Sequence, residues 1–302
     1  NCYYLKEALS QHLGVSPAHL IVGNGSDEII ELIAKAFLNE GEETIVADPT
    51  FSEYDFATKI MGGRTIVVPT KDLTHDLEAM LAAVTDKTKL VFICNPNNPT
   101  GTLVDKASVD AFLDKLPQDV ITIFDEAYYE YVTAENYPQT VEYVQAGRKV
   151  IVLRTFSKIY GLAGLRVGYG ISTPEIIGML HRVKEPFNVN LLAQAAAVAA
   201  LNDTDHLEKS RAVNDEGKNY LYQEFEKMGL FYQPTHANFI WVQVKADSQT
   251  VFAKLLRRGV IIRTGDIFGA PDVIRVTIGT PEQNQRFIAA LRDVLTEEGV
   301  LG

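Results

Sequence analysis

The segment LVFICNPNNPTG, residues 90–101, is the most informative part of the sequence for the fold. In it a continuous apolar run leads directly into a rigid, proline-rich turn. A second run, VITIF at residues 120–124, has the same continuous apolar character. A strand that is apolar at successive positions is buried on both faces, which is typical of a mostly parallel sheet covered by helices. We therefore expect an α/β fold around these two strands.

On both sides of this segment, short β-branched runs alternate with helical patterns through the first two thirds of the chain. Strands are expected at residues 20–22, 44–47, 65–68, 89–94, 120–124 and 150–154, with helices at 26–39 and near residues 56, 80 and 112. A helical region over 173–228 then leads into expected strands at 239–244, 260–263 and 273–278, with helices near residues 255 and 287.

This pattern predicts two domains. The first, residues 1–208, is a large domain with a mostly parallel central sheet sandwiched by helices, and residues 1–20 are free to pack on the other domain. The second, residues 209–302, is a smaller C-terminal α+β domain joined to the first through a long helix. Two domains side by side leave a cleft between them, which is a usual place for a ligand.

The composition limits the classes of partner. The 28 basic and 39 acidic residues give a formal net charge of −11, and a negative surface repels nucleic-acid phosphates. Cys2 and Cys94 form no CxxC pair and the histidines form no HExxH motif, so no metal site is expected. No signal peptide is visible, and the longest apolar run, residues 191–201, is too short to cross a bilayer. We expect a cytoplasmic protein without a membrane or nucleic-acid partner.

Polar residues follow the expected strands where each one ends. After the first strand, GNGSDE at residues 23–28 leads straight into a helix, and the free N–H groups and dipole of a helix start suit a phosphate. An ordinary capped helix explains Ser26 and Asp27 as well when the motif is taken alone. Asn98 follows the fourth strand, and Asp125 ends the fifth, where a buried acid is costly unless it is paired or caps a helix.

Lys158 follows the sixth strand in the segment RTFSK, residues 154–158. Partial burial there would lower its pKa, as a Schiff-base lysine requires, although a single lysine is most often a surface residue. Ligands of parallel sheets bind at the carboxyl ends of the strands. The helix start, Asn98, Asp125, Tyr128, Lys158 and Arg166 all follow strands, and as a set they suit one pyridine ring that carries a phosphate.

Three segments carry a family resemblance: NPNNPTG at 95–101, DEAYYEY at 125–131 and RTFSKIYGLAGLRVGY at 154–169. With these segments, essentially the whole chain resembles the fold-type-I pyridoxal-phosphate (PLP) aminotransferases, and among them those that act on histidinol phosphate. The resemblance implies PLP as the cofactor and ping-pong transfer of an amino group from histidinol phosphate to 2-oxoglutarate, a step of histidine biosynthesis.

The resemblance also implies roles for individual residues. Lys158 would hold PLP covalently, and Asp125 would pair with the pyridine nitrogen. Asn98 and Tyr128 would hydrogen-bond the phenolic oxygen of the ring, on which Phe51 would stack. The residues expected to bind the cofactor phosphate are Ser26, Asp27, Thr155, Ser157 and Arg166.

The expected substrate contacts are in the smaller domain. Arg263 and Arg275 match the arginines that bind the phosphate or carboxylate of the substrate, although for any single arginine a surface ion pair is the simpler interpretation. Most relatives keep only the second arginine, so Arg263 favours a phosphate-bearing substrate. Asn238 is expected to contact the site as well. The resemblance further implies a homodimer, in which a tyrosine of an N-terminal arm ahead of this sequence reaches the cofactor phosphate of the partner.

Three alternatives stay open. An aromatic amino-acid aminotransferase shares the chemistry with a wider pocket. A decarboxylase of a phosphorylated amino acid uses the same scaffold and releases carbon dioxide instead of forming glutamate. A PLP-sensing regulatory domain lacks turnover and follows a DNA-binding module, which this sequence does not contain.

Overall fold

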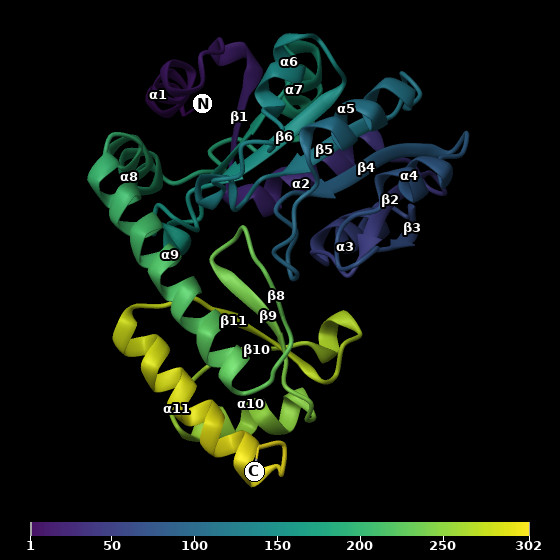
Figure 1. The fold of residues 1–302 in the computed structure, drawn as a ribbon. Helices are drawn as coiled ribbons and strands as arrows, with labels where there is room; N and C mark the ends of the chain where they lie inside the picture. The colour runs from purple at the N-terminus through teal and green to yellow at the C-terminus, as the bar shows by residue number, and fades with distance from the viewer. Residues whose placement is uncertain (1, 302) are drawn as a thin grey trace.

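The computed structural model describes residues 2–301, which form a larger unit and a smaller C-terminal unit (Figure 1). The larger unit is built on a seven-stranded sheet with the order β1-β7-β6-β5-β4-β2-β3. Its strands are β1 Leu20–Gly23, β2 Glu43–Asp48, β3 Arg64–Pro69, β4 Thr88–Cys94, β5 Ile121–Asp125, β6 Val150–Thr155 and β7 Gly168–Ile171. Of the seven described strands, β7 points in the direction opposite to the other six, so the expected mostly parallel sheet is confirmed.

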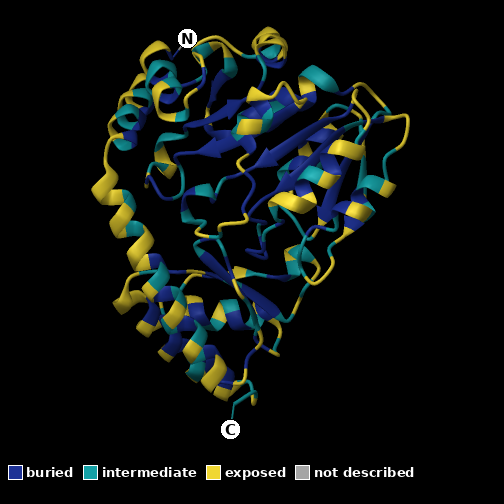
Figure 2. Cartoon of the chain, turned by 45° about the horizontal axis from the view of Figure 1, so that its top comes forward, coloured by how far each residue is buried: buried dark blue, intermediate teal, exposed yellow. Residues whose placement is uncertain are grey.

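Helices cover both faces of this sheet because successive strand residues point to opposite sides. In β6, Val150 and Val152 pack into one buried cluster, while Ile151 and Leu153 pack into the other. The first cluster is covered by α1 Tyr3–Leu13, α4 Leu77–Ala82, α5 Lys106–Lys115, α6 Thr140–Gln145 and α8 Leu191–Leu201. The second is covered by α2 Gly25–Phe37, α3 Glu53–Ile60 and α7 Pro174–Val183. The strands inside the sheet are accordingly buried, whereas the edge strand β3 and the outer helix faces are largely exposed (Figure 2).

The first helix belongs to the larger unit. Leu5 and Leu9 of α1 are fully buried in the same cluster as strand residues of the seven-stranded sheet, and α1 packs beside α8. The helix α1 therefore packs on the larger unit, and not on the smaller one as the sequence analysis allowed.

The smaller unit has a four-stranded antiparallel sheet with the order β10-β11-β9-β8. Its strands are β8 Tyr232–Gln233, β9 Phe239–Gln243, β10 Arg263–Thr264 and β11 Val273–Thr277, and α10 Ser248–Arg257 and α11 Pro281–Glu297 pack with them around a separate core. The strand expected at 260–263 is shorter than predicted, because Val260 donates its N–H to Leu255 at the end of α10 and so belongs to the helix exit.

One long helix, α9 Thr204–Lys227, connects the two units (Figure 1). Leu207 packs against the core of the larger unit, while Leu221 and Phe225 are buried in the core of the smaller one. The domain boundary expected between residues 208 and 209 falls inside this helix and stays a prediction. The helical region expected over 173–228 is divided into α7, α8 and α9, because Asn190 and Asp203 cap new helices. No helix within the described residues 2–301 is both long enough and apolar enough to span a membrane.

Candidate active site

A cavity of about 120 Å³ lies at the carboxyl ends of the parallel strands. Its lining residues are Ser26, Asp27, Phe51, Cys94, Asn98, Asp125, Ala127, Tyr128, Thr155, Ser157, Lys158 and Arg166. Every residue that the sequence predicts to bind the cofactor is in this set, and only Cys94 and Ala127 are additional. The strand ends therefore bring these side chains together, as expected for ligand sites of parallel sheets.

The start of α2 forms one end of the cavity. Its N-cap residue, Asn24, makes no side-chain cap, so the first-turn N–H groups are not satisfied by that residue. Gly25 has a φ of 80°, and a Cβ at this position would collide with the guanidinium of Arg166. Glycine is therefore required here, both for the backbone conformation and for the close approach of Arg166.

Arg166 links the start of α2 to the loop that carries Lys158. Its Nη2 donates to Asp27 Oδ2 at 2.9 Å, and its Nη1 lies 3.4 Å from Ser157 Oγ. Its φ of 55° is in the left-handed region, which a residue with a side chain rarely adopts. Such strain persists where the surroundings impose it, and it is concentrated at functional sites. Thr155 supports the same loop, because its Oγ1 accepts the N–H of Ser157 at 3.1 Å.

Lys158 and Asp125 both line the cavity, and each influences the pKa of the other. Lys158 is half-buried, and burial lowers its pKa while the charge of Asp125 acts in the opposite direction. Its Nζ lies 5.2 Å from the ring centroid of Tyr128. Asp125 is only 3% exposed, and burial raises its pKa to about 6. The cavity thus contains an amine that gives up its proton more readily than an exposed lysine does, near a carboxylate that is mostly ionised at neutral pH.

Asn98 and Tyr128 form the side of the cavity nearest the smaller unit. The guanidinium of Arg275 donates to Asn98 Oδ1, so the amide carbonyl faces Arg275 and the NH₂ group is left to face other partners. Tyr128 packs edge-on against Phe239, with ring centroids 5.0 Å apart, and the guanidinium of Arg275 lies 4.9 Å from the centroid of the same Phe239 ring. Burial raises the pKa of Tyr128, so its hydroxyl stays protonated.

The turn after β4 is held by hydrogen bonds of the buried Asn97 side chain. Asn97 Nδ2 donates to the carbonyl of Pro49 at 3.0 Å, and its Oδ1 accepts the hydroxyl of Thr50 at 2.8 Å. These two bonds fix the segment that carries Phe51. On its other side the turn meets the smaller unit, where the N–H of His236 donates to the carbonyl of Gly101 at 2.8 Å.

The three predicted substrate residues do not line the cavity. Arg263 is paired directly opposite Arg275 in the register of β10 and β11, and Arg263 is exposed whereas Arg275 is half-buried. Like charges at such positions destabilise a sheet. Burial and the charge of Arg263 both lower the pKa of Arg275, and no carboxylate among the described residues acts against them. Asn238 precedes β9, and its backbone carbonyl accepts the N–H of Ile278 at 2.9 Å.

Two buried polar contacts were not predicted from the sequence. Tyr54 on α3 donates its hydroxyl to Asp125 Oδ2 at 2.7 Å. Glu126 and Arg154 form a buried ion pair at 2.9 Å, and Arg154 also lies 3.5 Å from the ring centroid of Tyr129. The signal for the ion pair was present, because Glu126 directly follows β5 and Arg154 lies on the neighbouring strand β6.

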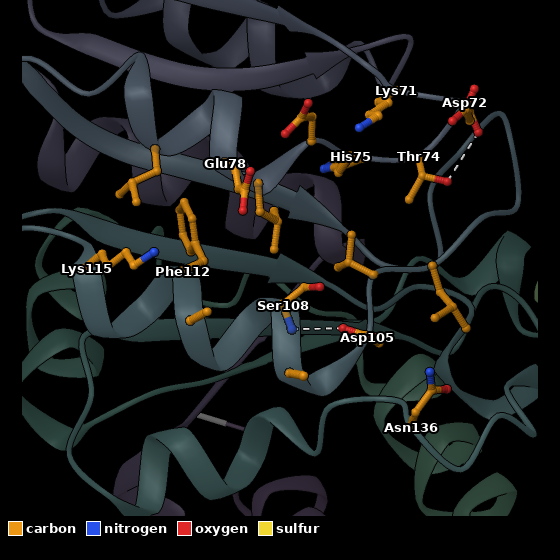
Figure 3. Close-up of a pocket in the computed structure, with 17 residues that line it drawn as sticks. Lys71, Asp72, Thr74, His75, Glu78, Asp105, Ser108, Phe112, Lys115 and Asn136 are labelled. Carbon is orange, nitrogen blue, oxygen red and sulfur yellow. Dashed lines mark hydrogen bonds between the residues drawn. The ribbon is translucent and has the colours of Figure 1, made fainter.

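A larger cavity of about 840 Å³ lies between α4 and α5, away from these residues (Figure 3). It contains none of the predicted site residues. His75 on its wall is buried, and His75 Nε2 lies 3.1 Å from Asn97 Oδ1. Because Nδ2 of Asn97 donates to a carbonyl, Oδ1 is the acceptor and the His75 nitrogen is the donor. His75 therefore supports the turn after β4 from the side of this second cavity.

The fold and the cavity are those of an aminotransferase. A family model described as "Aminotransferase class I and II" matches residues 3–291, and the chain belongs to this family. The resemblance stated from the three sequence segments is thereby confirmed.

Two curated relatives and one solved structure that are similar to this chain are histidinol-phosphate aminotransferases. The chain is 62% identical to the histidinol-phosphate aminotransferase of Moorella thermoacetica, over 98% of this chain and 77% of the relative. It is 49% identical to that of Brevibacillus brevis, over 97% of this chain and 80% of the relative. The crystal structure of the Sinorhizobium meliloti enzyme in complex with pyridoxal-5'-phosphate has a TM-score of 0.93 and 30% identity, and the match covers 98% of this chain and 82% of that chain.

Proposed function

We propose that this chain is a PLP-dependent aminotransferase that transfers the amino group of histidinol phosphate to 2-oxoglutarate. One observation carries the proposal: Lys158, Asp125 and the start of α2 line a single cavity at the sheet edge. The names of the relatives support the substrate, and the two alternative enzymes considered from the sequence are not favoured by them.

The lining residues fit PLP by their chemistry. The glycine-led start of α2 and Arg166 suit its phosphate, since a helix N-terminus and a guanidinium both bind this anion. A carboxylate and an amine with a lowered pKa suit its pyridine nitrogen and its aldehyde. When bound, PLP takes up the substrate amine and withdraws electrons from the substrate carbon.

Lys158 is proposed as the proton carrier of the reaction. A neutral amine accepts a proton, and burial increases the neutral fraction of Lys158 at a given pH. Asp125, as a carboxylate, would hold a proton on the ring nitrogen, because a negative charge favours the protonated form of its partner. The Asn98 NH₂ group and the Tyr128 hydroxyl would donate hydrogen bonds at the edge of the ring, and Phe51 would cover its face.

Arg263 and Arg275 are proposed to bind the anionic groups of the two substrates. Two guanidinium groups side by side, without a carboxylate acting on Arg275, favour an added anion, which relieves their mutual repulsion. A guanidinium binds phosphate and carboxylate in the same bidentate manner. The pair therefore suits both the phosphate of histidinol phosphate and a carboxylate of 2-oxoglutarate. Asn238, on the segment that leads to Phe239, is proposed as a further polar contact.

We also propose that the chain forms a homodimer in the cytoplasm. Exposed apolar side chains gather where α1 and α8 pack together: Tyr3 and Tyr4 on α1, and Leu191 and Leu192 on α8. Phe187, just before α8, is 94% exposed and has a φ of 60°. An apolar patch of this kind marks a protein interface, and a second copy is the proposed occupant. Both cysteines are free, which fits a reducing compartment.

The test is a two-substrate assay with the purified protein and added PLP. Glutamate should form from histidinol phosphate and 2-oxoglutarate faster than from phenylalanine or tyrosine and 2-oxoglutarate. Equal or better use of the aromatic amino acids would reject histidinol phosphate as the substrate. Release of carbon dioxide without glutamate would reject transamination.

A further inference from the structure

We propose that Tyr54 is a positioning residue whose hydroxyl holds the Asp125 carboxylate in its orientation and in its charged form. The inference rests on the proposed function, in which Asp125 faces the ring nitrogen of PLP. It starts from the 2.7 Å hydrogen bond between the Tyr54 hydroxyl and Asp125 Oδ2.

The hydrogen bonds of Asp125 are few for a buried carboxylate. Oδ2 accepts the Tyr54 hydroxyl, and Oδ1 accepts the N–H of Ala127 at 3.2 Å. Each carboxylate oxygen can accept two hydrogen bonds, so the group keeps the capacity to accept more from the cavity that it lines. Because the bond from Ala127 is longer, Tyr54 is the stronger of the two restraints on the orientation of the carboxylate.

Tyr54 is itself held rigidly. Its side chain is fully buried on α3, and its ring stacks on that of Phe92 with centroids 4.5 Å apart and an angle of 12° between the planes. It also packs edge-on against Phe51, with centroids 5.7 Å apart. The same side chain therefore contacts the acid and the aromatic ring that are proposed to lie on different parts of the cofactor, and it fixes the distance between them.

The titratable groups around Asp125 come from four elements. Tyr54 on α3 and Lys158 after β6 favour the ionised carboxylate, while Asp27 at the start of α2 opposes it. Cys94 at the end of β4 stays a neutral thiol, because burial raises its pKa to about 12. Burial is the largest influence on Asp125 and favours the neutral acid. The Tyr54 hydroxyl, whose own pKa is raised well above 10, offsets part of this influence as a permanent donor.

The decisive variant is Tyr54→Phe, which removes the donor and keeps the stacked ring. The protein without cofactor is labelled at its aspartate carboxyl carbons and titrated by NMR, with Asp125→Asn to assign the signal. The midpoint of Asp125 should rise by about one to two pH units, because a hydrogen bond to a charged group is worth about 1.5–3 kcal/mol. An unchanged midpoint overturns the proposal.

Tyr143→Phe is the matched control. Tyr143 also donates its hydroxyl to an aspartate, Asp110 Oδ1, at 2.6 Å, but neither residue lines the cavity. This variant should leave the Asp125 midpoint unchanged. An equal shift of Asp125 in both variants would mean a general loss of structure and would also overturn the proposal. If Tyr54→Phe does not fold, Tyr54→His supplies a ring N–H donor, and an Asp125 midpoint at or below the wild-type value supports the role of the donor.

A second readout uses PLP itself. At pH 7 the Kd for PLP should rise about tenfold in Tyr54→Phe, as the loss of about 1.4 kcal/mol predicts. The same change on an Asp125→Asn background should have no further effect on the Kd, and full additivity of the two changes would contradict the proposal. The titration uses neither PLP nor substrate, so its result stands even if the proposed substrate is wrong.

Discussion

The two units of the molecule place functional residues by different means. In the larger unit, the residues of the cavity lie at the ends of strands, in the loops beside them or at the start of α2, and the parallel sheet collects these positions at one edge. In the smaller unit, Arg263 and Arg275 are paired on short antiparallel strands, and Arg275 contacts the cavity by donating to Asn98. In this molecule the parallel sheet gathers the cavity residues at its own edge, whereas the antiparallel sheet contributes Arg275 only because the smaller unit lies against the larger one.

The largest effect is expected at Lys158, in the part of the site that strand order makes. Lys158→Ala should reduce amino transfer by about 10⁴-fold, because it removes the group proposed to move the proton. It should also remove the absorption band that PLP has when it is covalently bound to the lysine, while the far-UV circular dichroism stays that of the wild type. Retained absorption, or activity within tenfold of wild type, would show that the cavity residues do not work as proposed.

A smaller and more selective effect is expected at Arg263, in the part that the second unit contributes. Arg263→Ala should lower kcat/KM for histidinol phosphate by about 10- to 100-fold, which corresponds to one charge-assisted contact. The effect on turnover of phenylalanine should be much smaller, because phenylalanine has no phosphate. Equal losses with both substrates would remove Arg263 from the choice of substrate and leave Arg275 as the main anion contact.

The smallest effect on activity is expected at Glu130, where the two units meet, and there the predicted change is in stability. Glu130 lies in the short 3-10 helix Tyr129–Tyr131, its Oε2 is buried without a partner, and its backbone carbonyl accepts from Arg211 of α9 at 2.6 Å. Burial raises its pKa from 4.5 to about 7, so the folded state binds a proton that the unfolded state releases. Stability should therefore fall as pH rises from about 4.5 to about 7 and then stay level.

Glu130→Gln removes this dependence, because the amide does not ionise. The variant should be more stable than wild type by about 1–3 kcal/mol at pH 8, and close to wild type at pH 4.5, in urea unfolding. The same difference at both pH values would contradict a buried, ionising Glu130. A stabilised variant that keeps its activity would show that the contact between the units needs no charge at this position.

The sequence predicted the sheet and the cavity lining well for physical reasons. Continuous apolar runs reveal doubly buried strands, and the residue after each run is then placed at a known edge. Asp125 and Lys158 were found in this way, because Asp125 ends β5 and Lys158 lies just after β6. Their chemical roles remain proposals, because position alone does not determine what a side chain does.

Other features could not be read from the chain. The strand β7 is short and half glycine, and it runs against its neighbours, so no apolar pattern marks it. Tyr54 lies on a helix whose apolar spacing is that of ordinary core, and only the packing of α3 reveals its bond to Asp125. The exact limits of the two domains are hidden as well, because α9 continues through the expected boundary.

That continuity gives α9 a mechanical meaning. Its 24 residues form a rod of about 36 Å, with Leu207 packed against the core of the larger unit and Leu221 and Phe225 buried in the core of the smaller one. No loop interrupts α9 between the two cores, so the two units are joined here by helix and not by a flexible linker. A proline in the middle of α9 is therefore expected to change how the smaller unit lies against the cavity without altering either arginine.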